Sequence, residues 1–579
     1  MVRDPARGAH HLLPDQPGVL VSLSVLLLSA VASAATGIPV DPVLDPDDQA
    51  RHDQLRAAFD THFHPERVAA PVHLDDGHAH GGTGAHSGSA AILFETGEGF
   101  ACLTQLVAEL KRDWHLFSAS ERAEMTAILA PWKADLLDPD MVVHEDGSVP
   151  PPASPCNGYQ YDNFVDGQYH SVQWEDGAVT EGRAERFLES LDFSYEVEVE
   201  EQGWKAPNRI TSYPMGVYIV NGSYAGAYTT VAECGSTWQP YVVAYAGGLV
   251  GGTWYKTMAC HEFNHASQFS YGQAHEFWWW EATATYVEEY VYPEYNEWAS
   301  FVGTYGDVPH VGLNASAGNS NDQTLFYHTY AMAIWGFYLD QYWGGLDLVL
   351  ETWDLSYERA FDTRGYDYWM PDVIEDAGLA FDEVWTGFMA ANAVMAYAER
   401  DEFPEAERTD EVRELPAEGE ESARYAPQSL GMAFVSFDGD LGSDGDMLEV
   451  SINGQNGPDW YAVLVRGDDA IEETVVFEIE PETGRGTARI AFDGSTDLHL
   501  VVSPVDEEAQ GYSYRWDRAD DHGFSWDAEL VAAEDLAEAP PVAEEDESAS
   551  GCGCSAGPTG VPVTGALLGL VAVVRRRRH

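Results

Sequence analysis

Hydrophobic and polar positions recur with two different periods along the chain, and the change from one to the other separates its regions. A period near 3.6 predicts three helices before residue 160, at 53–63, 102–117 and 120–136. Alternation with a period of two then predicts three strands, at 169–174, 215–220 and 240–245. A helix at 181–191 separates the first two strands, and helical patterns dominate from the third strand to about residue 400.

A second run of alternating residues follows Pro427. It predicts six short strands separated by Asn-Gly, Asp-Gly and Thr-Gly turns, at 432–437, 448–452, 460–465, 474–479, 488–492 and 498–503. Strands of this length and spacing indicate a β-sandwich, which we assign to residues 403–530 as an accessory domain. The candidate calcium ligands there do not follow the EF-hand pattern, which favours a solvated loop; they are Asp438, Asp440, Asp444 and Asp446.

The N-terminal end of the sequence is typical of a secretory signal. Arg3 and Arg7 precede an apolar run at 19–32, and Ala32-Ser33-Ala34 offers small residues for signal peptidase. The apolar run is shorter than the ~20 residues that a membrane-spanning helix needs. We therefore expect residues 1–34 to be a signal peptide that is removed.

The C-terminal end has the composition of a second sorting signal. An acidic, Pro/Ala-rich linker at 531–551 precedes a tail at 552–579, which contains Cys552 and Cys554, an apolar segment and a cluster of arginines. This order resembles the MYXO-CTERM sorting signal of myxobacterial surface proteins. The resemblance implies processing of the tail and attachment of the body to the outer membrane through one of the two cysteines; a permanent anchor is the alternative. Both predict a secreted, extracellular or cell-surface protein.

Two further regions lie between the signal peptide and the β-sandwich. Residues 35–160 form a helical region that is either a propeptide or an N-terminal domain, and its histidine-rich stretch at 78–86 is typical of a flexible linker. Residues 161–402 contain the strand–helix–strand unit and the helices that follow it. The predicted fold class is α+β.

Charge and composition exclude some classes of function. The chain has 29 Lys+Arg against 97 Asp+Glu, and the formal net charge of −68 repels phosphate backbones. Nucleic acid is therefore excluded as a partner of the folded body. The content of 45% hydrophobic residues excludes a disordered chain. The sequence leaves the oligomeric state open.

Four cysteines lie outside the C-terminal tail: Cys102, Cys156, Cys234 and Cys260. An even number in an exported protein predicts disulfides. We favour Cys102–Cys156 and Cys234–Cys260, because each pair lies within one predicted region. No pair has CxxC spacing, so a structural zinc site built from these cysteines is not expected.

The motif that carries chemistry is His261-Glu262-Phe263-Asn264-His265, an HExxH sequence. On a helix the two histidines lie one turn apart on one face, so both imidazoles can bind a single ion, and Zn²⁺ suits such ligands. Glu262 can reach a water molecule beside that ion without being a ligand, which makes it the candidate general base. The alternative is a core helix whose histidines are satisfied by hydrogen bonds.

A catalytic zinc site takes a third protein ligand. Residues 278–286, WWWEATATY, resemble the second motif helix of the gluzincins, the zinc peptidases of clan MA in which that helix supplies a glutamate. The resemblance implies Glu281 as the third ligand. Glu276 and Glu288 are the alternatives, and Glu288 is also a candidate for orienting a histidine.

The resemblance extends to a later helix and to the chain as a whole. Residues 327–339 resemble the helix that carries the transition-state tyrosine of aminopeptidase-like gluzincins, which implies Tyr330, or else Tyr327, as a donor to the oxyanion. A buried aromatic stripe is the alternative. The GAMEN-type motif of true aminopeptidases is absent, which favours endopeptidase action. Residues 169–400 and the β-sandwich together resemble a myxobacterial family of secreted metalloproteases.

These features predict a zincin-like metallopeptidase domain, a small mixed sheet plus active-site helices, followed by an all-β sandwich. The expected activity is zinc-dependent hydrolysis of protein or peptide substrates. One Zn²⁺ is expected on His261, His265 and Glu281, with Glu262 and Tyr330 as catalytic residues. The alternative is a non-catalytic surface adhesin or binding protein with a structural or degenerate zinc site.

Overall fold

The computed structural model describes most of the chain between residues 42 and 531. The described residues are 42, 44–63, 101–129, 160–222, 226–234, 237–250, 252–271, 277–315, 323–363, 370–421, 425–506 and 522–531. They all belong to the first of two compact units, 1–532 and 533–579. The expected signal peptide, the histidine-rich stretch, the tail and all of the acidic linker except Val531 lie outside the described residues, as do Cys156 and Glu276.

A six-stranded mixed sheet lies at the N-terminal side of this unit. Its strand order is β1-β5-β6-β4-β3-β2. Strands β3, β4 and β6 run parallel, β5 runs antiparallel to β6, and β1 pairs with the outer edge of β5 in parallel. The bounds are β1 Ala101–Cys102, β2 Asn163–Asp166, β3 His170–Trp174, β4 Met215–Val220, β5 Gly226–Cys234 and β6 Thr237–Tyr245.

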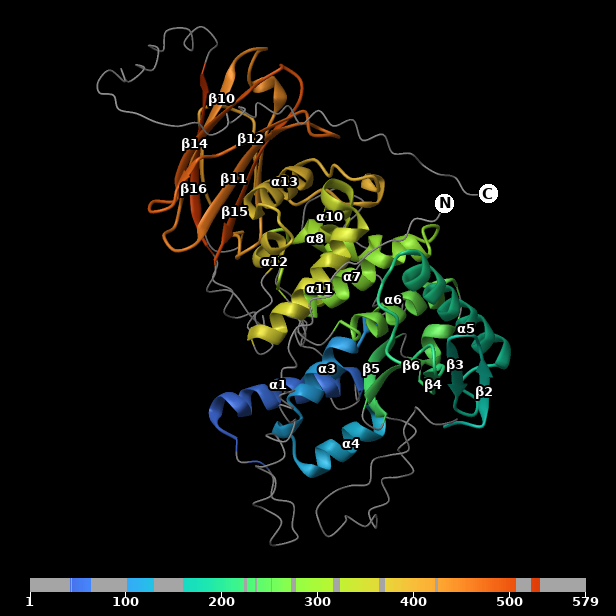
Figure 1. Ribbon diagram of the computed structural model, residues 1–579. Helices are drawn as coiled ribbons and strands as arrows, with labels where there is room; N and C mark the ends of the chain where they lie inside the picture. The colour runs from blue at the N-terminus through green and yellow to red at the C-terminus, as the bar shows by residue number, and fades with distance from the viewer. Residues whose placement is uncertain are drawn as a thin grey trace, which may run out of the picture. The chain divides into compact units, whose positions relative to one another are not determined.

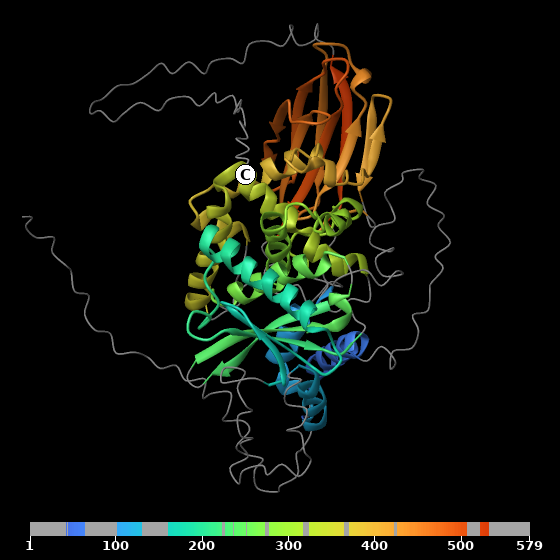
Figure 2. The same ribbon diagram turned by 90° about the vertical axis from the view of Figure 1, so that its right-hand side faces the viewer.

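Helices cover both faces of this sheet, as expected of strands that are buried along their whole length. In β4, Val217 and Ile219 belong to the core formed with helices α5 and α6, and Tyr218 and Val220 to the core formed with α1, α3 and α4. Figure 2 shows the sheet between these two groups of helices. The bounds are α1 Pro46–Phe63, α3 Thr104–Arg112, α4 Ala119–Leu129, α5 Glu181–Tyr195 and α6 Trp254–Gln268.

A tryptophan-rich helical core follows α6 in sequence and lies beside it (Figure 1). Trp278, Trp279, Trp335, Trp353 and Trp385 are fully buried there. Large aromatic side chains of this kind supply much of the apolar area that holds a helical layer together. The helices are α7 Phe277–Val291, α8 Ala299–Asp307, α9 Gln323–Ala331, α10 Ala333–Leu339, α11 Leu346–Thr363, α12 Met370–Asp376 and α13 Phe381–Ala393.

Two five-stranded sheets form the C-terminal part of the unit and share one apolar core. Their orders are β13-β14-β10-β16-β8 and β12-β11-β15-β9-β7. The second sheet also packs on the helical layer, where the Trp385 indole N–H donates to Ser503 Oγ at 3.2 Å. The bounds are β7 Asp410–Val412, β8 Ala417–Glu421, β9 Ala433–Phe437, β10 Met447–Gly454, β11 Asp459–Arg466, β12 Glu473–Val476, β13 Ile479–Glu480, β14 Arg485–Ala491, β15 Leu498–Val505 and β16 Phe524–Val531.

The predicted α+β class is confirmed, and several local predictions need correction. The helix expected at 102–117 begins at Thr104, and Cys102 lies instead in strand β1. The strand expected at 474–479 is interrupted between β12 and β13. The pattern also missed β5, in which small and hydroxylated residues interrupt the apolar alternation.

The expected disulfides are wrong at Cys102 and Cys260, the two of these cysteines whose side chains the structure describes. Cys102 and Cys260 are free thiols, and both are buried. Cys260 Sγ lies 3.1 Å from the carbonyl oxygen of Thr257, one turn earlier on α6. Cys102 Sγ points toward His265. Each thiol therefore makes a polar contact that a disulfide bond would remove.

Within the described ranges, no helix combines the length and the apolar character that crossing a membrane requires.

The β-sandwich contains a buried histidine that links its stability to pH. His499 on β15 contacts Gly467 O and Ser436 Oγ at 3.0 Å each, and burial lowers its pKa to about 4. Below pH 6.5 His499 is protonated in the unfolded chain but stays neutral in the folded chain. The free energy of unfolding therefore falls as the pH falls toward 4. Between pH 7.5 and pH 5 we expect the wild-type free energy of unfolding to fall by about 2 kcal/mol more than that of His499→Gln. Urea titrations at both pH values measure this difference, and equal losses would refute it.

Candidate metal centre

Helix α6 presents the HExxH motif at a fully buried position. Gly252, with φ +60°, forms the turn before the helix, and residues 257–268 are all buried. The helix contacts β5 on one side and α7 on another. His261 and His265 lie on one face of α6, with ring centroids 4.8 Å apart. The local structure is therefore the helix that the motif predicts.

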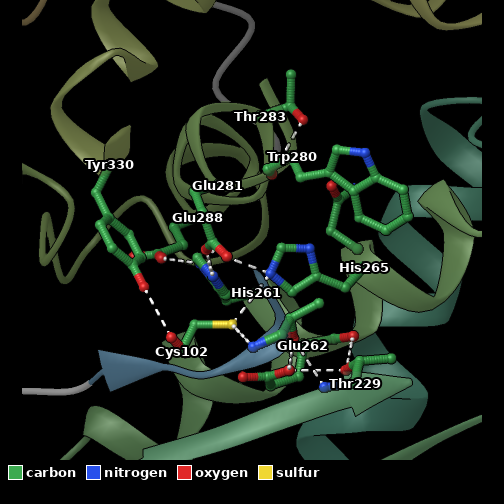
Figure 3. Close-up of polar contacts among 12 residues, drawn as sticks. Cys102, Thr229, His261, Glu262, His265, Trp280, Glu281, Thr283, Glu288 and Tyr330 are labelled. Atoms are coloured by element: carbon green, nitrogen blue, oxygen red, sulfur yellow. Dashed lines mark hydrogen bonds and ion pairs between the residues drawn. The ribbon is translucent and has the colours of Figure 1, made fainter. Parts of the chain in front are cut away.

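Helix α7 carries Glu281 to the same point (Figure 3). Glu281 Oε2 lies 3.1 Å from His261 Nε2 and 3.4 Å from His265 Nε2. All three side chains are within 2% of complete burial. The structure thus brings together the three residues predicted as metal ligands, and Glu288, the alternative ligand, contacts His261 from the other side.

A fourth donor comes from strand β1, far away in the sequence. Cys102 Sγ lies 3.3 Å from His265 Nε2 and comes from the strand that pairs with β5. One ligand atom each from Cys102, His261, His265 and Glu281 lies within 4.8 Å of the others. The sequence did not indicate Cys102 as a ligand, because its position predicted a helix and a disulfide.

These four residues fit a zinc ion by the chemistry of their donor atoms. Imidazole nitrogen, carboxylate oxygen and thiolate sulfur are the ligands that Zn²⁺ takes in tetrahedral sites. Glu281 Oε1 has no hydrogen-bond partner although it is buried, which is costly in the absence of a cation. A divalent ion at the meeting point of the four side chains would compensate the buried negative charge.

The outer nitrogens of both histidines are held by fixed acceptors. His261 Nδ1 contacts Glu288 Oε1 at 2.9 Å, and His265 Nδ1 contacts Gln268 Oε1 at 2.7 Å. The Gln268 amide donates in turn to the Trp280 carbonyl and to Thr283 Oγ1. Such contacts orient metal-binding imidazoles and direct Nε2 inward. Gln268 lies three residues after His265, so helical spacing could have identified it.

Glu262 lies beside this group, on the side facing the sheet. Its Oε2 accepts from Thr229 Oγ1 at 2.7 Å and from Thr104 Oγ1 at 3.4 Å. Its Oε1 is buried and has no hydrogen-bond partner. Burial raises the pKa of Glu262 above the usual value of a carboxyl group. A carboxylate with a raised pKa and one open oxygen is suited to exchange a proton with a bound molecule.

Tyr330 approaches the group from α9. Its ring stacks on His261, with centroids 5.9 Å apart, and its hydroxyl donates to the Cys102 carbonyl at 3.2 Å. Tyr327 is also buried, and its ring packs on Phe301 and Tyr330. Tyr330, the first of the two tyrosines named by the sequence, therefore contacts both His261 and Cys102.

The electrostatics of the site follow from carboxylates that enclose His261. Burial disfavours the charged imidazole, but hydrogen bonds to Glu281 and Glu288 outweigh it and raise the pKa of His261 to about 10. Burial likewise opposes ionisation of Glu281, yet the nearby His265 and His261 lower its pKa to about 2. Burial raises the pKa of Glu288. The two carboxylates therefore favour positive charge at His261, next to the point where the four side chains meet.

The candidate calcium ligands do not assemble in the same way. In the part of the chain that the structure describes, the group around Cys102 is the one set of three or more potential ligands close enough to hold an ion. Asp446 instead accepts a hydrogen bond from the backbone of Ser443 at 3.0 Å. Folding therefore does not bring the aspartates of the loop at 438–446 close enough together to bind calcium.

Two substitutions on α7 test the ligand assignment. Glu281→Ala removes a ligand, so we expect stoichiometric zinc to be lost. Glu288→Gln removes the charged acceptor of His261 and should weaken zinc affinity by about 10–100-fold. Glu289→Gln is the matched control, because that carboxylate accepts from the Trp298 indole. Zinc content and chelator competition measure all three. An unchanged zinc affinity in Glu281→Ala would remove Glu281 as a ligand and leave Cys102, Glu276 and Glu288 as candidates for its place.

Comparisons with known proteins do not assign this chain to a family. No protein-family model and no curated protein matches it. Among solved structures, the pre-peptidase C-terminal domain of a collagenase from Bacillus anthracis aligns over 22% of this chain and 99% of its own, with 9% identity and a TM-score of 0.15. The GH115 4-O-methyl-α-glucuronidase BtGH115A aligns over 47% of this chain and 39% of its own, with 10% identity and a TM-score of 0.13. Neither alignment is strong enough to transfer a fold or a function.

Proposed function

We propose that this protein is a zinc-dependent endopeptidase of the zincin type. The observation that carries the proposal is the convergence of His261, His265 and Glu281 on one point, with the carboxylate of Glu262 beside it. A cation site and an adjacent proton acceptor are the two parts that metal-assisted hydrolysis requires. The supporting resemblance to gluzincins rests on the same residues.

Each polar group of the site has a role in amide hydrolysis. His261, His265 and Glu281 would hold the ion, and Glu288 and Gln268 fix the imidazole rings. When bound, zinc supplies a Lewis acid that polarises a carbonyl group and activates water at neutral pH. Glu262 takes the proton from the attacking water and returns it to the leaving amine. Thr229 holds one oxygen of Glu262 in place, which leaves Oε1 to exchange the proton.

A structural zinc site in a non-catalytic binding protein is the competing function. It is favoured by Cys102, because four protein ligands are typical of structural zinc. Glu262 favours catalysis, since a structural site has no use for a buried carboxylate whose Oε1 lacks a partner. We therefore retain the hydrolase as the proposed function.

The terminal sequences support a proposed location. The signal-like residues 1–34 and the Cys/apolar/Arg tail at 552–579 favour export and attachment at the outer surface. Protein and peptide substrates met outside the cell fit this location. The charge of −68 makes nucleic acid an unsuitable partner there as well.

Glu262→Gln tests the hydrolytic role directly. The amide can still accept from Thr229 but cannot take a proton, so zinc content and thermal stability should be unchanged while cleavage of a casein substrate falls by about 10²–10⁴-fold. Glu289→Gln again serves as the control. Wild-type rates in Glu262→Gln would remove the proposed general base, and cleavage that survives complete chelation would remove the metal.

Tyr330→Phe and Tyr327→Phe form a matched pair on one helix. Both changes remove a single hydroxyl from a buried ring, and the Tyr330 hydroxyl donates to the Cys102 carbonyl at the site. If Tyr330 stabilises the oxyanion, kcat should fall by about 10²–10³-fold in Tyr330→Phe and stay near wild type in Tyr327→Phe. Steady-state kinetics on one peptide substrate decides between them, and equal effects would assign both rings to packing.

A further inference from the structure

Residues 102–104 contact all three groups that hydrolysis would use. Cys102 Sγ lies at the metal ligands, 3.3 Å from His265 Nε2. The Cys102 carbonyl accepts from the Tyr330 hydroxyl, and Thr104 Oγ1 donates to Glu262 Oε2. Figure 3 shows Cys102 between Tyr330 and the two histidines. One short segment therefore contacts the metal ligands, the proposed oxyanion donor Tyr330 and the proposed general base Glu262 at the same time.

We infer that Cys102 is the fourth zinc ligand and that residues 101–104 hold the site in a self-inhibited form. This inference rests on the proposed function and names the regulation of its site. A catalytic zinc needs an open coordination position for water or substrate, whereas four protein ligands leave none. Withdrawal of the segment would open that position and release Tyr330 and Glu262 at the same time.

The segment is anchored firmly enough to keep the closed form dominant. Strand β1 pairs with β5 at Ala101–Gly226 and Cys102–Ala227, and Leu103 N–H donates to the Ala227 carbonyl at 2.9 Å. Helix α3 follows at once and packs its apolar face on the sheet. The buried residues of this face, together with the preceding Leu103, share one apolar core with the sheet residues Tyr218, Tyr228, Tyr241 and Val243; on α3 they are Leu106, Val107 and Leu110. The apolar area held there opposes withdrawal of Cys102.

The test uses the full chain loaded with Co²⁺ in place of zinc, because a thiolate ligand gives cobalt a near-ultraviolet charge-transfer band. We expect the band in the wild type and in Cys260→Ala, whose thiol contacts Thr257, and its loss in Cys102→Ala. Acetohydroxamate, a small chelating probe, should change the cobalt spectrum of Cys102→Ala but not of the wild type. If Cys102→Ala does not fold, Cys102→Ser replaces it.

The outcomes separate the inference from the proposed function. Peptide hydrolysis by Cys102→Ala should exceed that of the wild type by at least about 10-fold, the factor for an open form populated at 10% or less. A wild-type cobalt spectrum without the thiolate band would overturn the inference, and so would equal acetohydroxamate binding by wild type and Cys102→Ala. If the probe binds only Cys102→Ala and no variant hydrolyses peptide, the closed site stands and the peptidase proposal fails.

Discussion

The need to compensate buried charge determines how this region of the protein is built. Glu262, Glu281 and Glu288 lie within one layer of the interior, and none is more than 3% exposed. Isolated carboxylates at such depth are unstable, so each must find a proton, a hydrogen-bond donor or a cation. The imidazoles of His261 and His265 meet part of this need, and a divalent ion at their Nε2 atoms would meet the rest. The surrounding sheet and tryptophan-rich helices supply the rigidity that keeps these groups at fixed distances.

Two layers of the fold position the site from opposite sides. Helices α6 and α7 bring the histidines and Glu281 together through packing against the aromatic core. The edge of the sheet supplies Thr229 from β5 and Cys102 from β1, so the position of the Glu262 carboxylate and that of the fourth donor depend on strand pairing. Because the donors come from both layers, a change in how the helices pack on the sheet alters the whole site. This coupling makes the site sensitive to any movement of β1.

The sequence predicted the parts of the site that helical spacing controls. His261 and His265 are one turn apart, so helical spacing was sufficient for them. Glu281 was indicated by the resemblance of residues 278–286 to the second motif helix of the gluzincins, with Glu276 and Glu288 as alternatives. Gln268 follows the same helical spacing and could have been predicted as a partner of His265. Cys102 could not be predicted, because 163 residues separate it from His265 and its two-residue strand leaves no periodic signal. Thr229 escaped for a related reason, because the Thr-Thr pair interrupts the alternation of β5.

The central claim is that four side chains from three elements meet on one metal ion. Zinc K-edge X-ray absorption of the metal-loaded full chain measures that first coordination shell directly. The structure predicts one sulfur at about 2.3 Å together with imidazole nitrogen and carboxylate oxygen ligands, four in total. A zinc shell that lacks either sulfur or imidazole nitrogen, or a chain that binds no zinc in stoichiometric amount, would contradict it.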